Sequence, residues 1–162
     1  MNIYKFYNKP KELITWHPDD PENIGIIEYK KDGELHRENK PAIEYPDGHK
    51  EWYLNGKIHR EDGPAIIFSD GTKEWRRNGK YHRKDGPAVI APDGTKKWFR
   101  NGELHQEDGP AIIFSDGTKE WRRNGKYHRE DGPAIEWPDG DKFWFLNGKI
   151  HREDEWKKKL NK

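Results

Sequence analysis

The chain of 162 residues has a length typical of one domain, yet 38% of it is charged and only 30% is hydrophobic. Its 31 basic and 30 acidic residues leave a formal charge of +1, which excludes a global electrostatic attraction to nucleic acid or anionic lipid. The absence of cysteine excludes disulfides, thiol nucleophiles and thiolate metal sites, while eight Trp, seven Tyr and six Phe supply apolar area for a thin, aromatic-rich core.

Residues 1–22 precede the regular part of the sequence and are predicted to form an N-terminal cap. An end unit of a repeat array needs a cap because its outer face otherwise meets water. The segment supplies apolar side chains for this purpose, namely Tyr4, Phe6, Tyr7, Leu13, Ile14 and Trp16.

Residues 23–151 repeat with a period of 23, without insertion or deletion, as one degenerate leading unit and five full units. A fixed period between roughly 20 and 50 residues is typical of an array in which each unit buries its apolar face against its neighbours. Histidine and tryptophan keep this period most visibly, at His36, His59, His82, His105, His128 and His151 and at Trp52, Trp75, Trp98, Trp121 and Trp144.

Each unit contains the signals of a β-hairpin. A β-prone run meets the turn pair Asp70-Gly71, and a second run meets Asn78-Gly79. Both pairs accept the positive φ angles of tight turns. A short strand at 80–82 then leads into a link that ends in Asp-Gly-Pro, where the proline can only open a strand.

The predicted fold class is therefore all-β, an elongated tandem array of 23-residue β-hairpin repeats with short caps at both ends and the tryptophan row as its core. Two strands per unit would make the array about 60 Å long, and one strand per unit about 30 Å. The sequence leaves both arrangements open.

Residues 152–162 are predicted to form a basic C-terminal cap or tail that folds onto the last unit through Trp156 and Leu160. The three lysines within this segment are the one local feature that would suit an anionic membrane surface. They are Lys157, Lys158 and Lys159.

Two periodic columns resemble chemical sites but are predicted to be structural. Histidines of adjacent units would lie roughly 10 Å apart if each unit adds two strands, whereas two ligands of one metal ion lie about 2 Å from it. An active site needs one asymmetric constellation, and the acidic column recurs through the array at Asp62, Asp85, Asp108 and Asp131. We predict no enzyme, no metal site and no cofactor. Each histidine is expected to anchor its link by hydrogen bonds to the backbone or to the nearby aspartate.

Two columns that vary between units are the candidate partner-binding positions, because a position free of the demands of the fold can serve recognition. The first column directly follows each tryptophan, and the second follows the first, so the two point to opposite faces of the sheet. The second shares the face of the tryptophans, and the first is expected to be an exposed stripe if the tryptophans form the core. The candidates are Tyr53, Arg76, Phe99, Arg122 and Phe145 in the first column and Arg77, Arg100 and Arg123 in the second.

Three interpretations of the stripe stay open. A protein partner would receive the aromatic and arginine side chains in acidic and apolar pockets, whereas a nucleic acid would stack its bases on the rings. The stripe could also be half-buried packing in which arginine stems lie over aromatic rings. The near-neutral charge and the adjoining Glu51, Glu74 and Glu120 favour a protein over a nucleic acid.

With units written HREDGPA and WYLNGK, residues 24–154 resemble the MORN repeat, in a variant that recurs in bacterial, bacteriophage and large DNA-virus proteins. The resemblance implies a row of β-hairpins in a strap-like sheet that serves as a scaffold or binding surface, and it implies no conserved chemistry. Because related variants occur in toxin–antitoxin and phage–host conflict, it also implies an inhibitor or immunity-type role.

We therefore expect a non-catalytic scaffold that binds a protein partner in the cytoplasm, or in the host cytoplasm if the chain is viral. The alternatives are a nucleic-acid-binding surface and a membrane-surface or structural scaffold. Pairing of two chains through edge strands or array ends is a further partner interaction that the sequence leaves open.

Overall fold

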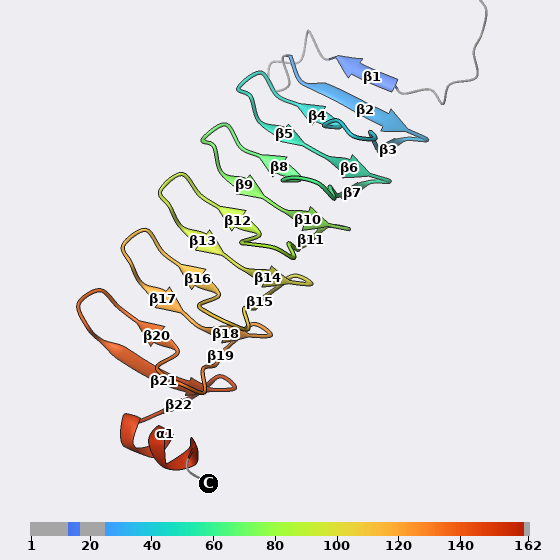
Figure 1. Cartoon of the computed structure of the whole chain (residues 1–162). Helices are drawn as coiled ribbons and strands as arrows, with labels where there is room; N and C mark the ends of the chain where they lie inside the picture. The colour runs from blue at the N-terminus through green and yellow to red at the C-terminus, as the bar shows by residue number, and fades with distance from the viewer. Residues whose placement is uncertain (1–12, 17–24, 161–162) are drawn as a thin grey trace, which may run out of the picture.

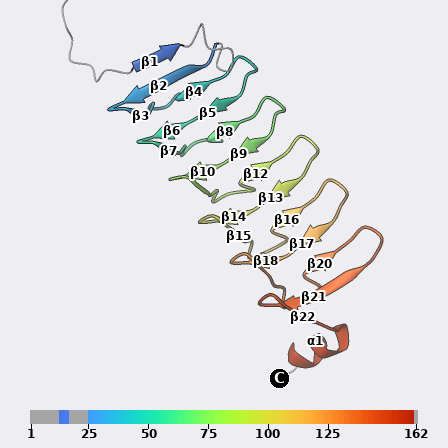
Figure 2. The same cartoon turned by 180° about the vertical axis from the view of Figure 1, so that it is seen from behind.

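The computed structural model describes residues 13–16 and 25–160, and within these ranges it contains 22 β-strands and one α-helix. The strands follow one another like the rungs of a ladder, from the blue N-terminal end to the red helix (Figure 1). Seen from behind, the helix again lies beyond the last strands rather than over the sheet (Figure 2). The predicted fold class, an elongated all-β array of hairpin repeats, is confirmed.

Each unit adds two antiparallel strands to one continuous sheet of fourteen strands. Ile66, for example, pairs with Glu74 of its own hairpin and with Glu51 of the preceding one. Two strands give a rise of roughly 10 Å per unit. The strands of this main sheet are β1 (Leu13–Trp16), β2 (Ile27–Lys31), β3 (Glu34–Leu35), β4 (Ile43–Glu44), β5 (Lys50–Glu51), β8 (Ile66–Ile67), β9 (Lys73–Glu74), β12 (Val89–Ile90), β13 (Lys96–Lys97), β16 (Ile112–Ile113), β17 (Lys119–Glu120), β20 (Ile135–Glu136), β21 (Lys142–Leu146) and β22 (Lys149–His151).

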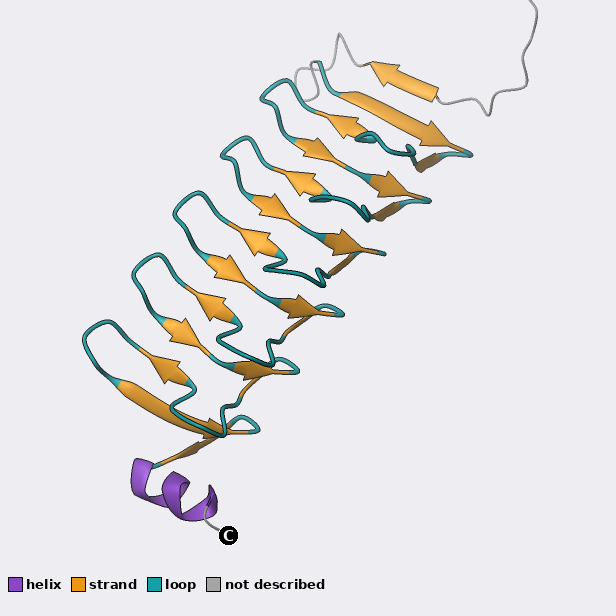
Figure 3. Ribbon diagram, viewed as in Figure 1, coloured by secondary structure: helices purple, strands orange, loops and turns teal. Residues whose placement is uncertain are grey.

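Four inner units extend beyond the main sheet into a small second hairpin. The tryptophan marks the junction, since the amide of Trp52 donates to the Ala65 carbonyl while its carbonyl accepts the amide of His59. Figure 3 shows these hairpins stacked along one side of the molecule, with the Asp-Gly turns along the other. They are β6 (Tyr53–Leu54) with β7 (Lys57–Ile58), β10 (Arg76–Arg77) with β11 (Lys80–Tyr81), β14 (Phe99–Arg100) with β15 (Glu103–Leu104), and β18 (Arg122–Arg123) with β19 (Lys126–Tyr127).

The two predicted turns form, but they are of different types. Asn78 and Gly79 have φ angles of 51° and 79°, as a two-residue turn with two positive φ angles requires. In the other turn only Gly71 has a positive φ, 90°, and its amide donates to the Phe68 carbonyl at 3.0 Å. This is a three-residue loop closed by a glycine bulge. The Asp70 carboxylate stabilises it by accepting the amide of Thr72 at 2.7 Å.

The core is a strip of small and aliphatic side chains rather than the tryptophan row. Of the periodic tryptophans only Trp52 is buried, at 7% exposed, and the other four are half-buried. The expectation of a tryptophan core was wrong, because a single-layer sheet has no second layer to enclose a large ring. The strip itself consists of Ala42, Ala65, Ala88, Ala111 and Ala134 with Ile43, Ile66, Ile112 and Ile135.

Different elements stand at the two ends of the array. Strand β1 pairs with β2 at the N-terminal end; the rest of the predicted cap at 1–22 lies outside the described residues. At the C-terminal end the predicted cap forms helix α1 (Glu153–Leu160). Trp156 is 6% exposed there, and its indole N–H donates to the Arg129 carbonyl at 3.3 Å. Residues 161–162 and the side chain of Leu160 are outside the described part of the chain.

Candidate partner-binding face

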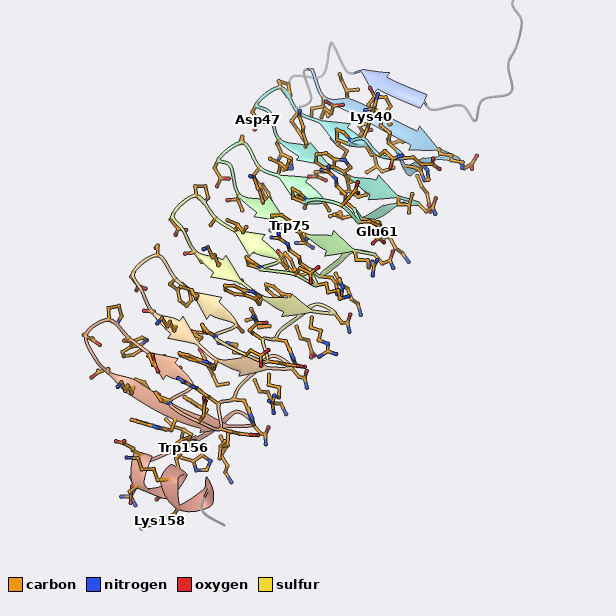
Figure 4. The ribbon with its side chains drawn as sticks, in the orientation of Figure 1. Lys40, Asp47, Glu61, Trp75, Trp156 and Lys158 are labelled. Carbon is orange, nitrogen blue, oxygen red and sulfur yellow. The ribbon has the colours of Figure 1, made fainter. Side chains whose placement is uncertain are left out.

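The segments that join successive units form one face of the array. Each link runs from a periodic histidine to the proline five residues later, and we call the side of the molecule that these segments cover the link face. The labelled Trp75 and Glu61 in Figure 4 belong to it and line one cavity. The links are residues 36–41, 59–64, 82–87, 105–110 and 128–133.

The histidine ties each of four links to the next unit. Its Nδ1 lies 3.1 to 3.3 Å from the backbone amide nitrogen of an asparagine 19 residues further on. In His36, His59 and His105 the same Nδ1 also lies 2.8 to 2.9 Å from the Oδ1 of that asparagine. Where Nδ1 accepts the amide, the proton of the neutral ring lies on Nε2, which is 3.0 Å from a glutamate oxygen in His59 and 3.2 Å in His128. The expected anchoring role is observed, with a glutamate in place of the expected aspartate. The pairs are His36 with Asn55, His59 with Asn78, His105 with Asn124 and His128 with Asn147.

The residue after the histidine is an arginine that covers an aromatic ring. The guanidinium of Arg83 lies 4.0 Å from the centre of the Trp75 ring, and Arg83 also donates to the Pro87 carbonyl at 3.1 Å. Such cation–π contacts stabilise a structure by about 0.5 to 2 kcal/mol. Sequence reasoning missed this role, although an arginine follows five of the six histidines. The equivalent pairs are Arg37 over Tyr29, Arg60 over Trp52 and Arg129 over Trp121.

Four clefts lie in a row on the link face, each between two successive links with one tryptophan in its lining. The spacing of the units places them roughly 10 Å apart. Acidic link residues line each cleft, as Glu61 and Asp62 do beside Trp75. We name the clefts after their tryptophans. Their volumes are about 290 Å³ for Trp52, 430 Å³ for Trp75, 370 Å³ for Trp98 and 620 Å³ for Trp121.

The first candidate column is half-buried instead of exposed. Arg76 donates to Glu74 at 2.8 Å, and its guanidinium lies 3.8 Å from the centre of the Tyr81 ring, which in turn stacks on Phe99. The same packing places Arg122 over Tyr127 and Tyr127 against Phe145. The column therefore makes contacts within the sheet, as the packing interpretation expects, and two of its members, Tyr53 and Phe99, also line clefts. Its members are Tyr53, Arg76, Phe99, Arg122 and Phe145.

The second candidate column is exposed and stands at the clefts. Arg77, Arg100 and Arg123 each line a cleft and each pair with a link glutamate. Arg77 binds Glu61 through two nitrogens, one of them at 3.0 Å, while Arg100 lies 2.7 Å from Glu107 and Arg123 lies 3.5 Å from Glu130. Exposed ion pairs contribute little to stability. These arginines are therefore available to a partner at small cost to the fold.

Hydrogen bonds and burial shift the titration of link-face carboxylates and of the Tyr53 phenol in opposite directions. On the link face, hydrogen bonds from Arg77 and His59 lower the pKa of Glu61, and the nearby His105 and Arg100 lower the pKa of Glu107. In the first candidate column, burial and the hydrogen bond to Glu51 raise the pKa of the Tyr53 phenol. The link face thus keeps both signs of charge at neutral pH.

Within the described residues, no group of three or more His, Asp or Glu side chains is arranged to hold a metal ion. The same part of the chain contains no helix with the length and apolar character needed to cross a membrane. Comparison of the chain with protein-family models and with curated protein sequences finds no match.

Proposed function

We propose that the chain is a non-catalytic repeat scaffold that binds a protein partner along its link face. The observation that carries the proposal is the row of four tryptophan-lined clefts with exposed arginines beside three of them. Trp and Arg are among the side chains that most often dominate binding energy at protein interfaces. A partner segment in the polyproline II conformation has three residues per turn and advances about 3.1 Å per residue, so every third side chain could enter successive clefts.

The charges of the clefts support a protein rather than a nucleic acid. Acidic link residues recur along the face, so a continuous phosphate backbone would meet them in most units and be repelled. A protein can instead match both signs of charge with its own side chains, which favours the correct partner and register.

The direct test is partner capture with two matched variants. The first carries Arg77→Ala, Arg100→Ala and Arg123→Ala on the link face. The control removes three exposed lysines from the main sheet of the same units, with Lys73→Ala, Lys96→Ala and Lys119→Ala. All chains are used as bait in a native lysate, with and without nuclease treatment.

We expect one protein to be retained by the wild type and by the lysine control, and retained about tenfold less by the arginine variant, as a loss of about 1.4 kcal/mol implies. Equal retention by both variants would refute binding through the link face. Retention that disappears with nuclease would assign the surface to nucleic acid.

We further propose, from the resemblance to MORN-like repeats, that the bound protein is a toxin or a phage or host factor that the scaffold inhibits in the cytoplasm. Support comes from the repeat pattern at 24–154 and from the row of clefts along the link face. The partner identified by capture should lose its activity when the purified chain is added. Full activity in the saturated complex would contradict an inhibitor role.

A further inference from the structure

One stretch of the array departs from its neighbours in charge. Residues 80–100 contain six basic and two acidic residues, a formal charge of +4. The equivalent stretches 34–54, 57–77, 103–123 and 126–146 carry −2, +1, −2 and −2. Lys84 stands where the other four links and the tail have glutamate, and Gln106 stands where all the others have arginine. Both residues line the Trp98 cleft.

Lys84 removes the carboxylate that a link histidine otherwise binds. His59 and His128 donate to glutamates, whereas the ring of His82 forms no hydrogen bond among the described residues. Lys84 itself forms no ion pair within the described part of the chain. The arginines on its two sides pair with the outer links, Arg77 with Glu61 and Arg100 with Glu107. At this wall of the cleft, the donors of His82 and Lys84 therefore have no acceptor among the described residues.

Gln106 removes the guanidinium that covers the equivalent ring in neighbouring units. Among the described residues no arginine lies over Trp98, whereas Trp75 and Trp121 on either side are covered. In the same cleft His105 is 9% exposed, and its buried Nε2 has no hydrogen-bond partner. The nearest carboxylate oxygen, Oε1 of Glu107, is 3.5 Å from this nitrogen and only 2.7 Å from Arg100.

We infer that the Trp98 cleft binds an acidic side chain of the protein partner, with an adjoining aromatic group of that partner stacked on Trp98. His82, Lys84 and His105 supply donors for the carboxylate, and charge-assisted hydrogen bonds of this kind are the strong ones. The cavity of about 370 Å³ has room for both groups. This inference rests on the proposed function, because it names the part of the partner that the scaffold recognises.

The flanking clefts argue against a nucleic acid in this position. Glu61 and Asp62 line the cleft before it, and Glu130 and Asp131 line the cleft after it. In the lining of the Trp98 cleft the three cations Arg83, Lys84 and Arg100 outnumber the two carboxylates Glu107 and Asp108. A single carboxylate therefore fits there, whereas a polyphosphate strand would extend into both acidic neighbouring clefts.

The experiment uses the full chain and a blocked tripeptide, acetyl-Glu-Phe-Glu-amide, as the probe. The indole N–H resonance of Trp98, assigned with Trp98→Phe, reports binding in the NMR spectrum. The main variant combines Lys84→Glu with Gln106→Arg, residues that the neighbouring units already hold, so the array is expected to fold. Lys119→Glu is the control, since it makes the same charge reversal as Lys84→Glu on an exposed residue outside the cleft.

We expect the tripeptide to shift the Trp98 resonance with a Kd on the order of 1 mM, equally in the wild type and in Lys119→Glu. The Lys84→Glu, Gln106→Arg variant should bind about tenfold more weakly or not at all. Acetyl-Gln-Phe-Gln-amide and inorganic phosphate should bind much more weakly than the acidic peptide.

The inference is overturned if the acidic peptide leaves Trp98 unshifted, if either control ligand matches it, or if the double variant binds it equally. Tighter binding of single-stranded oligothymidylate at Trp98 would assign the cleft to nucleic acid. A partner captured equally by wild type and double variant would leave the proposed function standing while this inference fails. If the acidic peptide binds at Trp98 but no protein is captured from the lysate, the cleft binds carboxylates as inferred while the proposed function fails.

Discussion

At the scale of residues, the bond between a link histidine and the next unit makes a measurable prediction. His128 is 9% exposed and accepts the amide of Asn147 at 3.1 Å. His128→Ala should lower the free energy of unfolding by about 1 to 3 kcal/mol, because it leaves that amide without a partner. His82→Ala is the matched control, since its ring forms no such bond, and urea unfolding followed by tryptophan fluorescence would compare the two. Equal losses in both variants would show that packing, not the hydrogen bond, is responsible.

The carboxylates of the turns and links predict the response of the fold to acid. The pKa values of Asp47, Glu61, Asp93, Glu107 and Asp131 lie below the ordinary values of 3.8 for Asp and 4.5 for Glu, because backbone amides, histidine or arginine side chains donate hydrogen bonds to them. A lowered folded-state pKa stabilises the fold above the ordinary pKa, and this stabilisation is lost as the pH falls through the folded-state value. These groups should therefore change the midpoint temperature of thermal unfolding little between pH 7 and pH 5.5, and the midpoint should decrease below about pH 4.5. A midpoint that rises below pH 4.5 would contradict this reading.

Residue-level contacts mark the limit of what the sequence predicts. Strand alternation places Arg77, Arg100 and Arg123 on the face of the tryptophans, which were expected to form the core, so the exposure of these arginines was not anticipated. The stacking of Arg83 on Trp75 was not anticipated either, because it joins side chains eight residues apart whose meeting depends on the path of the link. Gln106 stands where neighbouring units have the arginine that covers a tryptophan ring, and the sequence does not predict this role of the arginine for the same reason.

At the scale of elements, helix α1 is predicted to seal the last unit through one side chain. Trp156→Ala removes a ring that is 6% exposed, so it should cost about 3 kcal/mol of docking and abolish the small helical signal in circular dichroism. Lys158→Ala, on the exposed side of the same helix (Figure 4), should change stability by less than about 0.5 kcal/mol. A stable helix in Trp156→Ala would show that other contacts hold it.

Hairpins were predictable because their signals are local, whereas the packing between them was not. Asn78-Gly79 and Asp70-Gly71 specify turns from their own backbone preferences. The burial of Arg76 and Tyr53 depends instead on Glu74, Glu51 and the rings of neighbouring hairpins, which a strand period alone does not locate. The column that was expected to be an exposed stripe is therefore half-buried, and the proposed binding surface is the link face.

At the scale of the whole molecule, the number of strands per unit determines its length. The path of the main sheet crosses thirteen strands, which gives about 60 Å along the stacking direction. Small-angle scattering should yield a radius of gyration clearly above the roughly 15 Å of a globule with this many residues. A value near 15 Å would contradict two strands per unit, a choice that the sequence had left open.

Site-specific photo-crosslinking in the native cell tests most directly whether the partner binds along the link face. A photoreactive phenylalanine derivative would replace Asp62 or Asp108, which are exposed link residues, or the exposed Ser69 or Ser115 at the Asp-Gly turns. We predict a nuclease-resistant adduct with the same protein from both link positions and none from the turn positions. Adducts from the turn positions alone would contradict binding along the link face. The same conclusion would follow if a partner is captured but the link positions give no adduct with it.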